Sequence, residues 1–268
     1  MPVIKSFVTL AVLVSTASAG PASDSCPQRC AKINPDAMTA LDRMGEFLRA
    51  QQSFTIRTMA LKDYVLDNGQ KVQLASRGTL EAQRPDRLRI TTTSDRKRRQ
   101  FFYDGKTFTV YAPRVGFYAQ TPAPPTIGQL ADTLEQQKGL ELPLADLFRW
   151  GTPQSAAGEI TAAIDVGPAT VNGIACEQYA FRQPGLDWQI WIERGPRPLP
   201  RKLLLTTTDD PARPEYTVDL LWELRAHHDD ATFTFVPPRG AQQIAMVDAT
   251  PTTTKPADEA RATRNARR

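Results

Sequence analysis

The feature that most restricts the fold of this chain is the alternation of apolar and polar residues. It recurs in short runs that are separated by residue pairs typical of turns. Between residues 71 and 83, apolar or small side chains occupy every second position, and polar side chains occupy all the positions between them except Ala75. Asn68-Gly69 precedes this run, and Asp104-Gly105 and Asn172-Gly173 separate later runs. Side chains alternate between the faces of a strand, and Asn-Gly tolerates the positive φ angles of a tight hairpin turn. The pattern therefore predicts antiparallel strands joined by hairpins.

Two blocks of the chain show this pattern, residues 53–120 and 160–224. Their turn spacing predicts roughly ten strands, and Phe233 and Phe235 are expected to add a last short one. Consecutive strands should pair as neighbours, because no regular alternation of helix and strand and no internal repeat is present. The sequence predicts a mainly β (α+β) fold, in which a single curved antiparallel sheet forms an unclosed half-barrel.

Three segments have helical spacing instead. Asn34-Pro35-Asp36 supplies a cap, a first-turn proline and a carboxylate at the positive end of the helix dipole, and apolar residues follow at helical spacing. A second helix is expected between Thr126 and Gly139, and a short third one from Pro143 to Gly151. The N-terminal helix and this central helical pair either cover a ligand cavity on the concave side of the sheet or fill the core that any open sheet requires.

Aromatic residues are dense in the first block, at positions 101–103, 108, 111, 117 and 118. Alternation cannot place all of these rings on one face of a sheet. Core packing accounts for most of them, and the rest are expected on the convex side or in a ligand groove.

The N-terminus has the layout of a secretory signal. Lys5 is followed by the apolar run Phe7–Val14 and by Ala17-Ser18-Ala19, a small-x-small pattern that precedes cleavage. The run is shorter than the roughly 20 apolar residues that span a bilayer, and no later stretch is apolar enough to do so. We therefore expect a periplasmic protein with no transmembrane segment after cleavage. The expected parts are a signal peptide (1–19), a flexible leader (20–33), one folded domain (34–248) and a disordered tail (249–268).

The charge of the expected domain argues against a nucleic-acid partner. Residues 20–248 carry 27 Lys and Arg and 27 Asp and Glu, so the basic excess of the chain lies in Lys5 and in the tail. A nucleic-acid-binding domain needs a basic face that neutralises phosphates. The run Arg96–Arg99 is the exception, since it could meet anionic head groups or another acidic partner, although a solvated hairpin tip is the simpler interpretation.

Three cysteines remain after signal cleavage. Cys26 and Cys30 are close enough in sequence to form a local disulfide, which would leave Cys176 free, and either of the first two could instead pair with Cys176. A single C-x-x-x-C is a weak metal signal, because structural zinc usually takes four such ligands. No metal site and no cofactor is expected.

The usual catalytic signatures are absent from the sequence. It contains no G-x-S-x-G, H-E-x-x-H, Walker A or G-x-G-x-x-G motif. The two histidines, His227 and His228, are adjacent, and neighbouring side chains of an extended chain point to opposite faces. The cluster they form with Asp229-Asp230 is expected to be a solvated turn, so no catalytic residue is predicted.

Four segments of the chain resemble an uncharacterised family of predicted periplasmic proteins. The resemblance runs from about Asn34 to Gly240 and is carried by residues 84–89, 100–106, 142–148 and 181–192. That family in turn is similar to the LolA/LolB lipoprotein carriers and the RseB sensor domain. The resemblance implies an unclosed antiparallel barrel with helices as a lid, whose apolar concavity accepts acyl chains. No ligand-binding motif transfers residue by residue, so function follows only by analogy.

The resemblance and the pattern together favour a non-enzymatic carrier or chaperone for a lipid or a lipoprotein acyl chain. The alternatives are an RseB-like envelope sensor that binds a protein partner and, with less support, an enzyme. Face assignment gives candidate ligand contacts on the sheet and on the lid, and a register error of one residue would reverse several of them. On the sheet these are Leu74, Leu80, Leu88, Ile90 and Phe101. On the lid they are Leu130, Leu134, Leu144, Leu147, Phe148 and Trp150.

Overall fold

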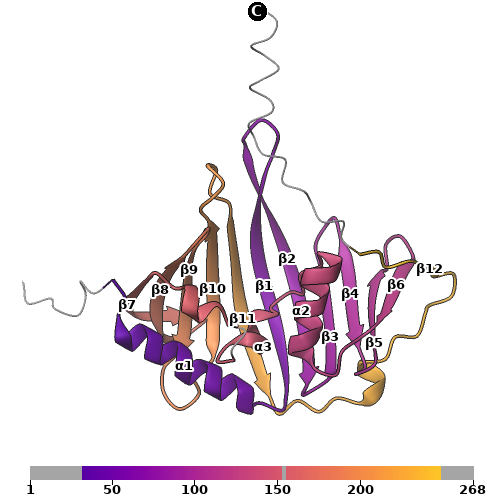
Figure 1. The fold of residues 1–268 in the computed structure, drawn as a ribbon, viewed down its shortest axis with the longest axis horizontal. Helices are drawn as coiled ribbons and strands as arrows, with labels where there is room; N and C mark the ends of the chain where they lie inside the picture. The colour runs from indigo at the N-terminus through magenta and orange to yellow at the C-terminus, as the bar shows by residue number, and fades with distance from the viewer. Residues whose placement is uncertain (1–31, 153–154, 249–268) are drawn as a thin grey trace, which may run out of the picture.

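The computed structural model describes residues 32–152 and 155–248 and contains one twelve-stranded sheet (Figure 1). Its strand order is β12-β6-β5-β4-β3-β2-β1-β11-β10-β9-β8-β7, and the two outer strands do not meet. All pairings are antiparallel except that of β12 with β6. The expected mainly β fold, a curved and unclosed sheet with helices on one side, is confirmed.

The strands of the first block are β1 (Ser53–Val65), β2 (Lys71–Gln83), β3 (Arg87–Thr93), β4 (Arg98–Tyr103), β5 (Thr107–Ala112) and β6 (Phe117–Pro122). Those of the second are β7 (Ala162–Val171), β8 (Ile174–Gln183), β9 (Leu186–Glu193), β10 (Pro200–Thr207) and β11 (Glu215–Leu224), and β12 (Gln242–Ile244) follows. The helices are α1 (Pro35–Ala50), α2 (Ile127–Lys138) and α3 (Asp146–Arg149), with 3₁₀ turns at Ala156–Glu159 and Asp230–Thr232.

The two meanders join at the centre of the sheet, where the first strand pairs with the last strand of the second block. Phe54 of β1 lies opposite Leu224 of β11, and Lys62 lies opposite Tyr216. The chain therefore lays the first meander on one side of β1 and the second meander on the other. The hairpin turns form as the sequence predicts: Gly69 has a φ of 80°, and Asn172 and Gly173 have φ angles of 49° and 79°.

Helix α1 begins where its capping residues predict. The Asn34 side chain accepts hydrogen bonds from the backbone N–H groups of Asp36 (2.8 Å) and Ala37 (3.1 Å), and Pro35 takes the first helical position. The Asn34 N–H also donates to the carbonyl of Ala163 on β7 at 2.9 Å. The buried face of α1 consists of Ala37, Leu41, Met44, Gly45 and Leu48.

The crossing of α1 and the segment after α3 depends on Gly45. A Cβ atom at this position would lie 3.0 Å from the backbone N of Gly151 and 3.1 Å from its Cα. We expect Gly45→Leu to lower the free energy of unfolding by about 1–3 kcal/mol, because the rigid backbone of Gly151 must move. Gly128→Ala on α2 is the matched control. An added Cβ there meets nothing within 4 Å, so helix propensity should raise stability by about 0.5–1 kcal/mol. Equal effects of the two substitutions in urea unfolding would contradict the close crossing.

The central helices differ in length. Helix α2 has the expected ends, with the Thr126 hydroxyl accepting from the Gln129 N–H (3.3 Å) and Gly139 in the left-handed region at a φ of 59°. The third helix is shorter than the expected Pro143–Gly151 segment, because Leu144 has a φ of 62° and regular helix begins only at Asp146.

The last strand does not lie where the sequence predicted it. Phe233 and Phe235 follow a 3₁₀ turn, and the chain becomes a strand only at Gln242–Ile244, parallel to β6. The Phe235 ring packs on Phe102, Tyr111 and Tyr118 with centroid distances of 5.1–5.3 Å. Phe101, Tyr103 and Phe108 instead belong to the main core on the helix-covered face. The dense aromatic cluster is thus divided between the two faces, and the C-terminal segment covers part of the convex one.

Several expectations concern residues outside the described part of the chain. These are the signal peptide, almost all of the leader, the tail, and the pairing of Cys26 and Cys30. Among the described residues the remaining cysteine, Cys176, is a buried free thiol whose pKa is raised by burial. No helix in residues 32–152 or 155–248 is long and apolar enough to cross a membrane.

A candidate apolar groove under helix α3

A groove of about 600 Å³ lies between the α2–α3 segment and the central strands of the sheet. A smaller hollow of about 150 Å³ continues it toward α1 and β9. The two share six lining residues, so they form one continuous recess: Asp146, Arg149, Trp150, Leu186, Leu203 and Leu205.

Alternation along β10 supplies the floor of this groove. Leu203 and Leu205 point toward the helices, while Leu204 between them points to the opposite face. Leu186 of β9 and Tyr216 of β11 extend the floor on either side. Tyr216 is neutral at physiological pH, and burial raises the pKa of its phenol further. The floor is thus uncharged and mostly aliphatic.

The roof is the short α3 segment. Leu144, Leu147 and Trp150 contribute apolar surface to it, and Leu142 lines the groove beside them. Two arginines hold this segment in place. Arg49 of α1 donates to the carbonyl oxygens of Gly151 (2.5 Å) and Trp150 (3.4 Å). Arg149 of α3 donates to two carboxylates of α2, Asp132 and Glu135.

Arg149 connects α3 to α2 through two carboxylates. Its Nε lies 3.0 Å from Oδ1 of Asp132, and its Nη2 lies 2.6 Å from Oε2 of Glu135. A third carboxylate, Asp146, is 3.6 Å from Nη1. Burial alone would lower the pKa of Arg149, but the hydrogen bonds and charges of Glu135 and Asp132 outweigh it and raise that pKa. The guanidinium is therefore a permanently charged link between the two helices.

The mouth of the groove is polar. Among its exposed lining residues, Lys62 and Glu215 belong to the sheet, with half-buried Asp63 beside Lys62, and Glu135, Glu141 and Asp146 belong to the helical segment. Burial opposes ionisation of Asp63, but its oxygens accept from the Glu215 N–H (3.2 Å) and Gln73 Nε2 (3.1 Å), and Lys71 lies 3.3 Å away. These contacts lower the pKa of Asp63 below its ordinary value, so it is an anion at neutral pH.

Three of the candidate ligand contacts line this groove, and the others do not. Leu144, Leu147 and Trp150 are at the roof. Leu74 is half-buried on β2, outside both hollows. The remaining seven are buried in the core, six where α2 packs on the first meander and Phe148 of α3 against Phe54: Leu80, Leu88, Ile90, Phe101, Leu130, Leu134 and Phe148. Both central helices contribute to the core, α2 through Leu130 and Leu134 and α3 through Phe148, and the α3 segment also lines the recess.

The floor residues were missing from the sequence-based candidates. Leu186, Leu203 and Leu205 lie on strands that the alternation predicts, and their common face could be inferred from it. The pattern does not indicate which half of the sheet a helix leaves uncovered.

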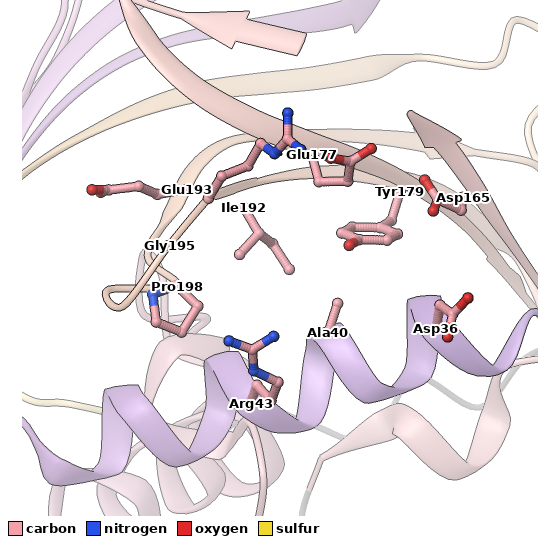
Figure 2. A pocket seen from close by; sticks show the side chains of 11 residues that line it. Asp36, Ala40, Arg43, Asp165, Glu177, Tyr179, Ile192, Glu193, Gly195 and Pro198 are labelled. Atoms are coloured by element: carbon pink, nitrogen blue, oxygen red, sulfur yellow. Dashed lines mark ion pairs between the residues drawn. The ribbon is translucent and has the colours of Figure 1, made fainter. Parts of the chain in front are cut away.

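A second hollow, of about 450 Å³, lies between α1 and the β7–β9 side of the sheet and is mainly polar. Figure 2 shows Arg43 pointing from α1 toward the sheet, with Tyr179 and Ile192 facing it. Burial and the nearby carboxylates of Asp165 and Glu177 raise the pKa of Tyr179 to about 12, so its hydroxyl stays protonated.

Two of the four carboxylates that line this second hollow, Glu177 and Glu193, are engaged in ion pairs, whereas no ion pair joins Asp36 or Asp165 to another described residue. Glu177 lies 3.4 Å from Arg194, and Glu193 pairs with Arg201 and lies 3.5 Å from Arg197. These contacts tie neighbouring strands and their connecting loop together. They give the hollow a structural role, and we assign no chemistry to it.

The two histidines differ in their surroundings, and only His227 fits the solvated turn that the sequence predicts. His227 is exposed and lies 3.5 Å from Asp229, whereas His228 is half-buried with its Nε2 3.3 Å from the carbonyl oxygen of Phe54. Within the described residues, no three His, Cys, Asp or Glu side chains are placed to hold a metal ion.

Comparison with solved structures gives only partial likenesses. LprF from Mycobacterium bovis aligns with 12% identity and a TM-score of 0.44, over 79% of this chain and 100% of that one. The lipoprotein LppX from Mycobacterium tuberculosis aligns with 6% identity and a TM-score of 0.40, over 73% and 98%. A LolA superfamily protein from Nitrosomonas europaea aligns with 10% identity and a TM-score of 0.34, over 74% and 97%. At these values the likenesses carry no information about function.

Comparison at the level of sequence is more decisive. No curated protein sequence matches the chain. The model of one family, described as "Predicted periplasmic protein (DUF2092)", matches residues 37–247 and so covers the sheet, its three helices and the groove. The chain belongs to this DUF2092 family of predicted periplasmic proteins.

Proposed function

We propose that this protein is a non-enzymatic periplasmic carrier that holds a lipid or a lipoprotein acyl chain in the groove under α3. The observation that supports this most is the composition of the recess. Leu203 and Leu205 form its floor, and Leu147 and Trp150 form its roof. A volume of about 600 Å³ is within the usual range of small-molecule sites. An acyl chain gains about 0.8 kcal/mol for each CH₂ group that leaves water.

Two further observations support the compartment. The family is described as periplasmic, and residues 1–19 have the n-region, apolar core and small-x-small pattern of a secretory signal. A carrier is useful there because acyl chains cannot cross the aqueous space between two membranes without a protein that covers them.

Native mass spectrometry with lipid extraction tests the proposal on protein purified from an envelope fraction without detergent. We expect a stoichiometric lipid or acylated-peptide adduct in the natural protein. Leu205→Arg should abolish it, because the substitution places a charge on the apolar floor. Leu204→Arg is the matched control, since this neighbour is also half-buried but faces the opposite side of β10.

The outcomes separate the candidate functions. A natural protein that remains free of ligand after incubation with lipids and lipopeptides would contradict the carrier. A protein partner that co-purifies in the absence of lipid would favour the envelope sensor instead.

A further inference from the structure

One edge of the sheet gathers features that the groove alone does not explain. Because consecutive strands are antiparallel, the β1–β2, β3–β4 and β5–β6 turns all lie at the same edge. The groove reaches the same edge. Its lining includes Lys62 and Asp63 near the end of β1, and Lys62 pairs with Tyr216 at the start of β11. Figure 1 shows the β1–β2 hairpin projecting beyond its neighbours at this edge.

The β3–β4 turn presents a concentrated positive charge. Arg96, Lys97, Arg98 and Arg99 are all exposed, and no ion pair joins any of them to another described residue. The turn is well defined, because the Ser94 N–H donates to the Lys97 carbonyl (2.8 Å) and the Lys97 N–H donates to the Ser94 hydroxyl (3.0 Å).

Two more arginines, Arg77 and Arg114, extend this positively charged turn. Together with Arg96, Lys97, Arg98 and Arg99 they form a surface called here the basic tip. Arg114, in the β5–β6 turn, donates from Nη2 to the Ser94 carbonyl at 3.4 Å, which places the two turns side by side. Arg77 on β2 lies opposite Thr93 at the end of β3 and is also exposed. Asp95 is the one carboxylate within the 94–99 segment.

The β1–β2 hairpin adds exposed apolar side chains at the same edge. Pairing with β11 ends at Lys62 and pairing with β3 ends at Arg77, so beyond these residues β1 and β2 pair only with each other. Near the tip of this free-standing hairpin, Tyr64 and Leu66 are each 42% exposed and Val65 is 37% exposed. An isolated two-stranded hairpin gains little stability from its own packing, so apolar residues at its tip suit a contact outside the molecule.

The charges along the edge are separated. The acidic Asp209 and Asp210 lie in the β10–β11 turn, on the other meander, and Glu215 lies level with the base of the β1–β2 hairpin. The part of the edge formed by β1 to β6 also holds Asp63, Asp67 and Asp95, but its cations outnumber them, so this part is net basic and carries the exposed apolar side chains.

We propose that this basic and apolar edge docks on a bilayer that contains anionic phospholipids. The basic tip would contact phosphate groups, and Tyr64, Val65 and Leu66 would enter the interfacial region. Each cationic side chain near an anionic surface strengthens binding about fivefold, and aromatic side chains prefer the headgroup level. A bilayer accounts for both the charge and the projecting apolar tip, whereas an acidic protein accounts for the charge alone. Docking places the groove mouth toward the lipid, but the binding itself requires no ligand in the groove.

Flotation of the ligand-free mature protein with vesicles tests the proposal. We expect binding to vesicles of phosphatidylcholine with phosphatidylglycerol, and much weaker binding to phosphatidylcholine alone. Arg96→Gln with Lys97→Gln should weaken binding to the anionic vesicles about thirtyfold. Added salt should weaken the binding of the natural protein as well.

Two controls make the outcome decisive. Arg194→Gln with Arg197→Gln removes the same charge from the opposite edge and should leave binding within about twofold of the natural protein. Leu205→Arg should also bind vesicles normally, so a failed carrier and a failed docking surface can be told apart. Equal binding to neutral and anionic vesicles, or equal loss in the two double variants, would overturn the proposal and leave the basic tip as a solvated turn.

Discussion

Replacing Phe54 with alanine is expected to lower the free energy of unfolding by about 3–5 kcal/mol. Phe54 is 2% exposed and lies on β1, where the two meanders join. Its ring centroid is 6.1 Å from that of Phe148 on α3 and 5.3 Å from that of Trp222 on β11. The substitution removes a ring that contacts the sheet and the roof of the groove together, and the surrounding strands cannot collapse onto the space.

Urea unfolding followed by circular dichroism measures this effect. Met59→Ala is the control, because Met59 lies on the same strand but is 58% exposed, and its loss should change stability by less than about 0.5 kcal/mol. If Phe54→Ala lowered stability no more than Met59→Ala, the centre of the sheet could not be packed as described.

The parts of the fold that the sequence predicts correctly follow from local patterns of residues. The run from Lys71 to Gln83 forms a strand because its alternation separates a buried face from a solvated one, and the Asn68-Gly69 turn fixes where its partner ends. Helices α1 and α2 begin directly after Asn34 and Thr126, because the side chains of these two residues accept hydrogen bonds from free N–H groups at the helix start. Each of these features depends on residues a few positions apart.

The features that the sequence did not reveal depend on distant residues. The pairing of Phe54 with Leu224 joins strands that are separated by most of the domain, and no local pattern specifies it. The period of two at Phe233 and Phe235 predicts a last strand there, but Phe235 packs on rings of the convex face instead. Pro237 and Pro238, which lack backbone N–H groups, follow directly and do not favour a continuing strand.

The same distinction applies to the groove. Its roof was predictable, because Leu147 and Trp150 belong to an amphipathic segment between the two meanders. Its floor was not, because alternation marks the apolar face of each strand without showing which strands a helix covers. Helix α2 has three turns and fills the concavity over the first meander, while α3 has one turn and leaves Leu203 and Leu205 accessible from the groove.

Replacing Arg149 with methionine is expected to lower the free energy of unfolding by about 2–3 kcal/mol and to release α3 from α2. The Arg149 side chain is 18% exposed, and its hydrogen bonds to Asp132 and Glu135 are charge-assisted. Methionine keeps most of the aliphatic stem, so the loss comes from the guanidinium. It leaves two carboxylates three residues apart on α2 without their common cation, and they then repel each other.

Arg149→Lys separates charge from geometry at the same position. Lysine retains one positive charge but lacks the planar fork that contacts both carboxylates, so we expect a loss of about 1 kcal/mol. Hydrogen exchange of residues 144–151 should increase strongly in Arg149→Met and weakly in Arg149→Lys, while exchange in β1 and β2 stays unchanged. If exchange rose equally across the whole sheet, Arg149 would stabilise the domain globally. A local increase would show that the roof of the groove opens independently of the sheet, which a carrier requires in order to load and release its ligand.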